Sequence, residues 1–340
     1  MVLMYSNNNS IIYAFRDKLI LRNVKEELTE VKVPTIKISK ETKGQIKENE
    51  ITCIKSSNDG LYVAVTTETK QLLIYTENFE LKKDILLQKT ANKICFTQDN
   101  NVLVADRNGD VLSYSLEEDI EKPTLLLGHL SVILDMVMSP CGKFIITCDR
   151  DEKIRVSCYP NSYNIISFCL GHKEFVSKLH LLKNNILLSA SGDGTVRMWN
   201  YLEGKELNRI DTSNFVNSNV LNSFISEMDA EKVEVSTLPI NDLQVYENGS
   251  KIILAVTDDN FYYFLTDKLY VISTDVAIYH FVNNQFEMKK SGIAEENLSK
   301  HGDLFQHKNN IMLLYKRRYN NVHEYLDRKR QRLEQKENKL

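Results

Sequence analysis

Short apolar runs separated by turn residues recur along most of the chain. One such unit has apolar runs at 51–54, 61–65 and 71–75, and its first turn, residues 57–60, has the sequence Ser-Asn-Asp-Gly. Asn, Asp and Gly tolerate a positive φ, which a tight hairpin turn requires. Runs of this length between turn residues predict short antiparallel strands joined by hairpins. The next unit has the same order, with runs at 93–96, 101–105 and 110–114.

The pattern is most regular in the middle third of the chain. The dipeptide Gly-His occurs there as Gly128-His129 and again, about 40–45 residues later, as Gly171-His172, and the second of these units ends in a strand with Trp199. This period, with Gly-His at one end and a Trp-containing strand at the other, is typical of a WD-repeat blade. Seven such blades need roughly 300 residues, and the chain has 340. We therefore expect an all-β fold, a seven-bladed WD-repeat β-propeller with a C-terminal basic helix.

The predicted propeller occupies residues 1–316. Residues 2–24 are interpreted as a hairpin, and ring closure predicts that the N-terminal strands share a blade with the last strands. The charged stretch 25–50 is interpreted as a loop or a mobile connection between strands. The stretch 211–236, rich in Ser and Asn and then acidic, is interpreted as an irregular insertion before a fifth unit at 243–265.

The end of the chain differs in charge, and residues 317–340 are assigned to a basic, helical C-terminal tail. From Lys316 onward there are nine Lys or Arg and four Asp or Glu residues. Apolar residues recur on one helical face: Tyr319, Val322, Leu326 and Leu333. A basic amphipathic helix is predicted. Whether it has a function or only packs its apolar stripe on the propeller is left open.

Composition narrows the class of protein. A formal net charge of −3 argues against bulk attraction to nucleic acid, and 42% hydrophobic residues suffice for a packed core. The six cysteines form no CxxC pair and show no metal-ligand spacing, so buried free thiols and no metal site are expected. No basic region followed by an apolar run begins the chain, and no stretch approaches about 18 apolar residues. These features predict a cytosolic or nuclear soluble protein.

The repeated polar residues predict a hydrogen-bond network within each blade. In such a network the His side chain of the Gly-His pair bonds to an Asp in a later turn, and a hydroxyl and the Trp complete it. The members expected here are His129 with Asp151 and Thr147, and His172 with Asp193, Ser189 and Trp199. A hydrolase triad is the alternative, but repetition at the blade period favours a structural role. In the earlier of these two units Ser157 stands at the Trp position, so its network is expected to be incomplete.

We expect no catalytic residues in this chain. The Gly-Asp-Gly sequence at 192–194 lies in a predicted hairpin, whereas a nucleotide-binding fingerprint lies between a strand and a helix. No methyltransferase core is visible among the 12 glycines.

Two sequence segments are more specific than the Gly-His and Trp signals of the WD repeat. They are 149–157, Asp-Arg-Asp-Glu-Lys-Ile-Arg-Val-Ser, preceded by Leu134-Asp135 and Ser139-Pro140, and 167–177, Ser-Phe-Cys-Leu-Gly-His-Lys-Glu-Phe-Val-Ser. Both resemble the non-catalytic WD-repeat subunit of eukaryotic tRNA (guanine-N7)-methyltransferase, a family that includes insect members linked to germ-cell development. The resemblance is close over roughly 125–200 and loose elsewhere.

The resemblance implies a regulatory subunit that is not itself an enzyme. In that family a separate catalytic subunit holds S-adenosylmethionine and methylates guanosine 46 in the tRNA variable loop, and the propeller stabilises it as a heterodimer and helps to position the tRNA. No cofactor is then expected on this chain, and a location in the nucleus, possibly also the cytoplasm, is implied. The alternative is a general WD-repeat scaffold that serves a different complex.

The resemblance also implies partner-binding residues. Lys178 stands where the family forms a salt bridge to an acidic residue of the catalytic subunit; otherwise it is an ordinary strand-edge lysine. Glu174 and Phe175 are its expected neighbours, with a core role for Phe175 as the alternative. Arg155 is a further candidate for contact with the partner. The alternative is that it pairs locally with Asp or Glu residues. Sequence-independent contacts to tRNA phosphates are expected from the basic residues Lys316, Arg317, Arg318, Arg328, Lys329, Arg330 and Arg332.

Overall fold

The computed structural model describes most of the first 257 residues and shorter stretches beyond. These are residues 2–6, 10–23, 28–34, 49–117, 122–212, 218–240, 242–248, 251–257, 268–272, 276–282, 285–289, 313–316 and 329–330. Within this part of the chain there are 25 strands and one α-helix, and no helix is long and apolar enough to cross a membrane.

Five antiparallel sheets of four strands make up the first two thirds of the chain. The N-terminal sheet contains β1 (Val2–Ser6), β2 (Ser10–Phe15), β3 (Lys18–Asn23) and β4 (Leu28–Lys32). Blade one contains β5 (Ile51–Ser56), β6 (Tyr62–Thr67), β7 (Gln71–Thr76) and β8 (Leu81–Leu86). Blade two contains β9 (Ala91–Phe96), β10 (Val102–Asp106), β11 (Asp110–Tyr114) and β12 (Thr124–Gly128).

The two blades with the strongest repeat follow. Blade three contains β13 (Ile133–Met138), β14 (Phe144–Asp149), β15 (Ile154–Cys158) and β16 (Ile165–Cys169). Blade four contains β17 (Val176–Leu181), β18 (Ile186–Ser191), β19 (Thr195–Asn200) and β20 (Lys205–Asp211). After helix α1 (Ser218–Ala230) come a two-stranded and a three-stranded sheet, made of β21 (Asp242–Asn248), β22 (Lys251–Thr257), β23 (Lys268–Ile272), β24 (Val276–Val282) and β25 (Gln285–Lys289).

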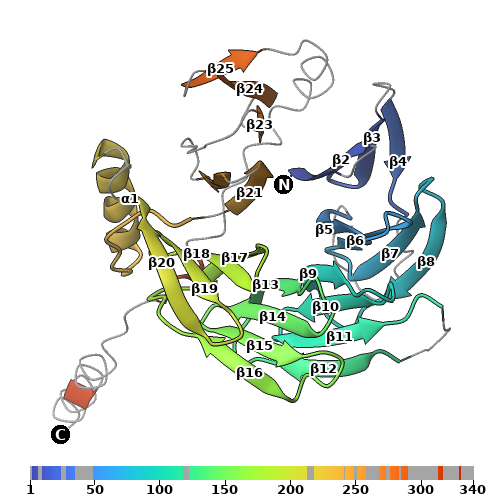
Figure 1. Ribbon diagram of the computed structural model, residues 1–340, viewed down its shortest axis with the longest axis horizontal. Helices are drawn as coiled ribbons and strands as arrows, with labels where there is room; N and C mark the ends of the chain where they lie inside the picture. The colour runs from blue at the N-terminus through green and yellow to red at the C-terminus, as the bar shows by residue number, and fades with distance from the viewer. Residues whose placement is uncertain are drawn as a thin grey trace, which may run out of the picture.

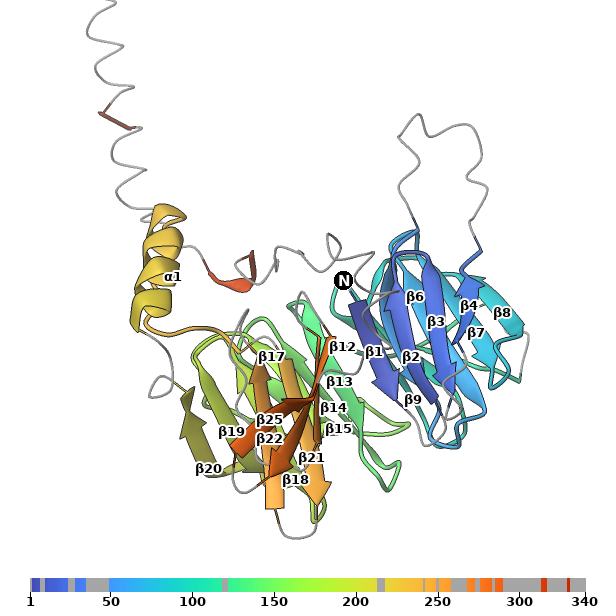
Figure 2. The same ribbon diagram turned by 90° about the horizontal axis from the view of Figure 1, so that it is seen from above.

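The blades follow one another round an arc, with the first strand of each innermost and the last outermost (Figure 1). The innermost strands of successive blades lie side by side. Figure 2 shows the N-terminal sheet beside blade one and helix α1 beside blade four. The predicted all-β propeller architecture is confirmed, whereas the number of seven blades stays a prediction.

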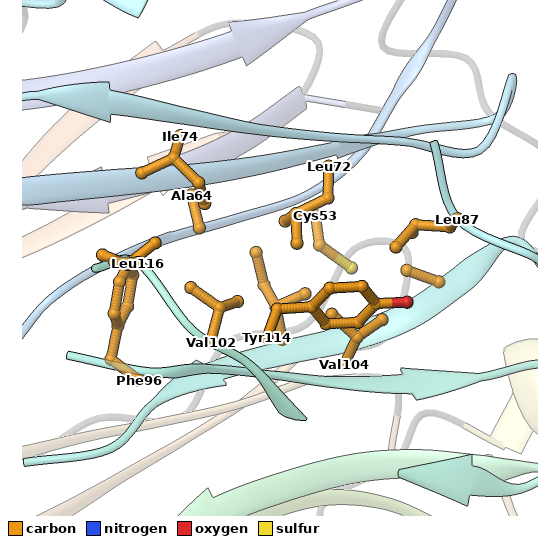
Figure 3. Packing of buried hydrophobic residues seen from close by; sticks show 12 residues of the cluster. Cys53, Ala64, Leu72, Ile74, Leu87, Phe96, Val102, Val104, Tyr114 and Leu116 are labelled. Carbon is orange, nitrogen blue, oxygen red and sulfur yellow. The ribbon is translucent and has the colours of Figure 1, made fainter. Parts of the chain in front are cut away.

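The core lies between the faces of neighbouring blades. Between blades one and two, Leu72 and Ile74 of β7 face Val102 and Val104 of β10 (Figure 3), and each is at most 1% exposed. A neighbouring blade covers each face of a middle strand, so β10 is buried at every position. This explains why the middle strands appear in the sequence as continuous apolar runs, without the alternation of a half-exposed sheet. Burying each such side chain stabilises the fold by about 1.5–3 kcal/mol.

The N-terminal region differs from the expectation. Strands β1 to β4 complete a four-stranded sheet, and among the described residues no later strand pairs with them, so the predicted shared blade is wrong there. Strand β4 also lies within the stretch 25–50, which was expected to be a loop or mobile connection. Strand β4 pairs with β3, from Lys18 opposite Lys32 to Arg22 opposite Leu28. The charged sequence of this stretch did not indicate a strand.

The predicted insertion is also more regular than expected. Its first residue ends β20, and residues 218–230 form α1. The predicted turn at residues 57–60 is present, and Gly60 has a φ of +77°. The C-terminal helix expected over 317–340 lies outside the described residues except for Lys329 and Arg330, which are helical and exposed.

Candidate partner-binding face of blades three and four

The structure brings together all the predicted network residues of blade four. Nδ1 of His172 lies 3.0 Å from Oδ2 of Asp193, and Nε2 lies 2.7 Å from Oγ of Ser189. The same hydroxyl accepts the indole N–H of Trp199 at 2.8 Å. Oδ1 of Asp193 accepts the backbone N–H of Thr195 at 2.9 Å. These buried polar groups satisfy one another, as in a structural network.

Blade three uses a different aspartate from the one expected. Nε2 of His129 lies 2.8 Å from the Thr147 hydroxyl, but Nδ1 lies 2.9 Å from Oδ2 of Asp149 and not beside Asp151. Asp149 ends β14, is 2% exposed, and its Oδ1 also accepts the backbone N–H groups of Asp151 and Lys153 in the turn. The predicted pairing of His129 with Asp151 is therefore wrong. The carboxyl of Asp149, at the buried end of β14, bonds to the imidazole and also accepts the backbone N–H groups of the turn that follows.

The Asp193 carboxyl has a pKa well below its ordinary value of 3.8. Burial raises this pKa, but the hydrogen bond and charge of His172, aided by donors from Thr195 and the backbone of Lys173, lower it by more. A carboxyl whose pKa is depressed by folding stabilises the fold above its unfolded pKa, and this contribution is lost as the pH falls through the folded pKa.

We therefore predict that Asp193→Asn lowers the stability of the protein at pH 7 and that the loss shrinks as the pH falls from about 5 to about 3. Urea unfolding midpoints at several pH values measure this difference. The matched control is Glu203→Gln, which removes an exposed carboxyl from the same blade. A destabilisation by Asp193→Asn that stays constant with pH would contradict the depressed pKa.

Phe175 is part of the core and not of the surface. Its side chain is 1% exposed and packs with Met228, Val233 and Tyr315. The proposal that its ring anchors a partner is wrong, because no face of the ring is accessible. The adjacent Glu174 is half-buried, and its backbone carbonyl accepts the Ser191 hydroxyl at 3.1 Å, which fixes the chain just before β17.

Lys178 is half-buried on the innermost strand of blade four, directly after a β-bulge. The same irregularity recurs in blades one to three and places Cys53, Lys93 and Asp135 at equivalent positions. Oδ2 of Asp135 accepts the backbone N–H of Leu179 at 2.9 Å, and Oδ1 lies 3.8 Å from Nζ of Lys93. Burial raises the pKa of the Cys53 thiol, and the charges of Lys93 and Lys178 oppose this rise. Equivalent positions on the innermost strands thus bring several ionisable side chains close together, and Asp135 fixes the backbone next to Lys178.

Arg155 is engaged by its own blade and by blade two, though not by the acidic residues expected. Its Nε donates to the Ser157 hydroxyl at 2.9 Å, and its terminal nitrogens donate to the carbonyls of Gly128 at 3.1 Å and Ser162 at 3.0 Å. Burial lowers its pKa. Ser157 occupies the position of Trp199, so blade three has these bonds, one of which reaches β12 of blade two, where blade four has an indole. This use of the guanidinium argues against a partner-binding role.

The structure also brings a distant segment to this face, which the sequence pattern did not reveal. The C-terminal latch, defined as residues 313–316, contacts Arg150 of blade three through two backbone carbonyls. Nζ of Lys316 lies 3.3 Å from Oδ1 of Asp151 and 2.5 Å from Oε1 of Glu152. Lys316 is therefore paired with carboxylates and does not have the surroundings expected of a phosphate ligand. Of the other predicted phosphate contacts, Lys329 and Arg330 are exposed, and Arg317, Arg318, Arg328 and Arg332 lie outside the described residues.

Among the described residues, no group of three or more His, Cys, Asp or Glu side chains is arranged to hold a metal ion. All six cysteines are free, and Cys53, Cys95, Cys148 and Cys169 are buried. A cavity of about 1010 Å³ lies between blades one and two, lined by polar residues such as Lys83, Asp84 and Asn101, and is remote in sequence from the residues of blades three and four. The chemistry available on blades three and four is that of a charged, rigid surface.

Comparison with known proteins matches residues 117–274 to the family described as the tRNA methyltransferase TRM82 WD40 domain. The chain is 49% identical over 157 residues to the tRNA (guanine-N(7)-)-methyltransferase non-catalytic subunit wuho of Drosophila yakuba, which is 44% of this chain and 37% of that protein. It is 45% identical over 159 residues to the subunit wdr4 of Xenopus laevis, covering 45% and 40% of the two chains. The chain thus matches about two fifths of the length of these relatives.

Solved structures support the fold alone. A chain in the crystal structure of the mitotic checkpoint complex superimposes with a TM-score of 0.59 at 14% identity, covering 86% of this chain and 80% of that one. The C-terminal WD40 domain of Sif2 gives a TM-score of 0.50 at 16% identity, with 81% and 79% covered. The matched residues 117–274 contain all of blades three and four. The resemblance expected from the sequence is confirmed: in its central part this chain is a WD40 propeller similar to the non-catalytic subunits of tRNA (guanine-N(7)-)-methyltransferase.

Proposed function

We propose that this chain is the non-catalytic subunit of a heterodimeric tRNA (guanine-N7)-methyltransferase, acting on guanosine 46 of the variable loop. The observation that carries the proposal is the 45–49% identity to proteins named as such subunits, together with the family match over residues 117–274, which include Glu174 and Lys178. The chain binds and stabilises a catalytic subunit, which holds S-adenosylmethionine. It performs no chemistry itself and works in the nucleus, possibly also in the cytoplasm.

The geometry of blades three and four supports a bracing role. The imidazoles of His129 and His172 each bond to a carboxyl and a hydroxyl of their own blade, which fixes the loops from which β13 and β17 start. Glu174 and Lys178 lie at the start of the second of these strands. A rigid backbone under a charged residue lowers the entropy cost of docking a partner.

Transfer RNA is the proposed substrate of the complex. The basic residues after Lys316 contact its phosphates, add affinity without reading bases, and make binding depend on salt. Lys316 is not among these contacts, because two carboxylates already pair with it.

Reconstitution tests the proposal. The catalytic subunit of the same organism is purified alone and with this chain, and methyl transfer from S-adenosylmethionine to a tRNA transcript is measured. We expect a one-to-one complex and at least about a tenfold rise in rate, equivalent to about 1.4 kcal/mol in the barrier. This chain alone is expected to be inactive, and a transcript with adenosine at position 46 serves as the control. Failure to form the complex, or stable capture of an unrelated partner instead, would favour a general WD-repeat scaffold.

A further inference from the structure

The C-terminal latch is held on the face of blades three and four by apolar contacts. Tyr315 is 2% exposed. Its ring centroid lies 5.0 Å from that of Phe175, edge to face at 81°, and 6.4 Å from that of Phe224 in α1. Met228 and Val233 complete this cluster. Three segments distant in sequence therefore form one small core above blade four.

Hydrogen bonds fix the latch in one position. Nε of Arg150 donates to the carbonyl of Leu314 at 2.8 Å, and Nη2 donates to that of Tyr315 at 3.2 Å. The Tyr315 hydroxyl donates to the carbonyl of Gly192 at 2.8 Å. A Cβ at Gly192 would lie 2.4 Å from the Phe175 ring, so glycine is needed for this close approach. Polar and apolar contacts together hold both the backbone and the side chain of Tyr315.

Ion pairs mark the end of the latch. Burial lowers the pKa of Lys316, but the hydrogen bonds and charges of Glu152 and Asp151 raise it by more, so that it is above its ordinary value. The lysine is thus held as a cation between two carboxylates of blade three. In the sequence, the basic stretch of the chain end continues with the next residue, Arg317.

We propose that the latch fixes the point at which the basic C-terminal residues leave the propeller, so that they meet tRNA phosphates beside the bound catalytic subunit. This inference rests on the proposed function. Phe175, against which Tyr315 packs, directly follows Glu174 on the proposed partner-binding face. A tethered charge acts at an effective concentration set by the tether, which falls when the attachment point is released. Tyr315 and Arg150 are positioning residues, since they act through the basic residues that follow.

The test uses the full-length chain in its complex with the catalytic subunit. Two variants release the latch without changing charge: Tyr315→Ala removes the buried ring, and Arg150→Lys removes the guanidinium bonds to the two carbonyls. The matched control is Tyr163→Ala, because Tyr163 is 75% exposed. The same substitutions are also made in a chain that lacks residues 317–340, and the affinity of its complex for tRNA is measured in the same way. Binding is measured at about 50 mM and about 200 mM salt, where phosphate contacts differ strongly in strength.

Both latch variants are expected to bind tRNA about three- to tenfold more weakly at low salt, with a smaller loss at high salt. In the chain without 317–340 the same substitutions should cause no further loss, because the residues they position are gone. The Tyr163 variant should bind like the parent. If Tyr315→Ala does not fold, the tRNA affinity of the Arg150→Lys variant alone tests the inference.

Equal losses in the full-length and shortened chains would overturn the inference, since the latch would then act only on folding. Unchanged affinity of both folded variants would overturn it too, as would deletion of 317–340 without effect at either salt concentration. Each of these results is obtained with a complex that forms and methylates tRNA. They are therefore distinct from a failure of the proposed function, in which no such complex forms.

Discussion

Replacement of Lys178 by glutamate is expected to weaken binding of the catalytic subunit by at least about 100-fold. The proposed partner residue is acidic, so the reversed charge changes an attraction into a repulsion. Like charges placed together at an interface cost several kcal/mol, and about 3 kcal/mol corresponds to a factor of roughly 150. Lys178 is half-buried at the inner edge of blade four, so the propeller should remain folded. Titration calorimetry and co-elution of the two subunits measure the effect.

The control is Lys173→Glu, which makes the same change in net charge at an exposed residue of the same blade. Its effect should be no more than a few-fold, because charges exposed at a rim contribute little to affinity. Changing the acidic partner residue to lysine should restore binding to the Lys178→Glu chain. If that chain still co-elutes with the unmodified catalytic subunit, the salt bridge is not at Lys178.

The parts of this fold that could be predicted are those that repeat. His172, Ser189 and Trp199 were identified because Gly-His and the Trp-containing strand recur at the blade period, and a period constrains which residues face one another. The same reasoning failed by two residues in blade three. There, Asp149 at the strand end and Asp151 in the turn are both plausible partners of His129, and only the geometry separates them.

Other features were harder to predict for physical reasons. Helix α1 has its apolar residues at i, i+3, i+4 and i+7, namely Leu221, Phe224, Ile225 and Met228, but this signal is short and lies among serines and asparagines. Docking of the latch could not be predicted, because Arg150 and Tyr315 are 165 residues apart in the chain. Contacts at such separation depend on how the blades are arranged in space, and no local pattern encodes them.

Truncation of the tryptophan of blade four should have the largest effect on stability. Trp199 is 1% exposed and lies in a cluster with Ile146, Val176 and Leu187, so it joins blade four to blade three. Trp199→Ala is expected to cost about 4 kcal/mol, from lost burial and from the cavity left behind. Denaturant unfolding midpoints, with the slope checked for change, measure the loss.

A second substitution at Trp199 separates packing from hydrogen bonding. Trp199→Phe keeps an aromatic ring but removes the N–H that donates to Ser189, so it should cost about 1–2 kcal/mol in addition to any loss from the smaller ring. The control is Phe168→Ala on the outermost strand of blade three, where the side chain is 40% exposed and the cost should be within about 1 kcal/mol. A Trp199→Ala variant no less stable than this control would mean that the indole does not hold the two blades together.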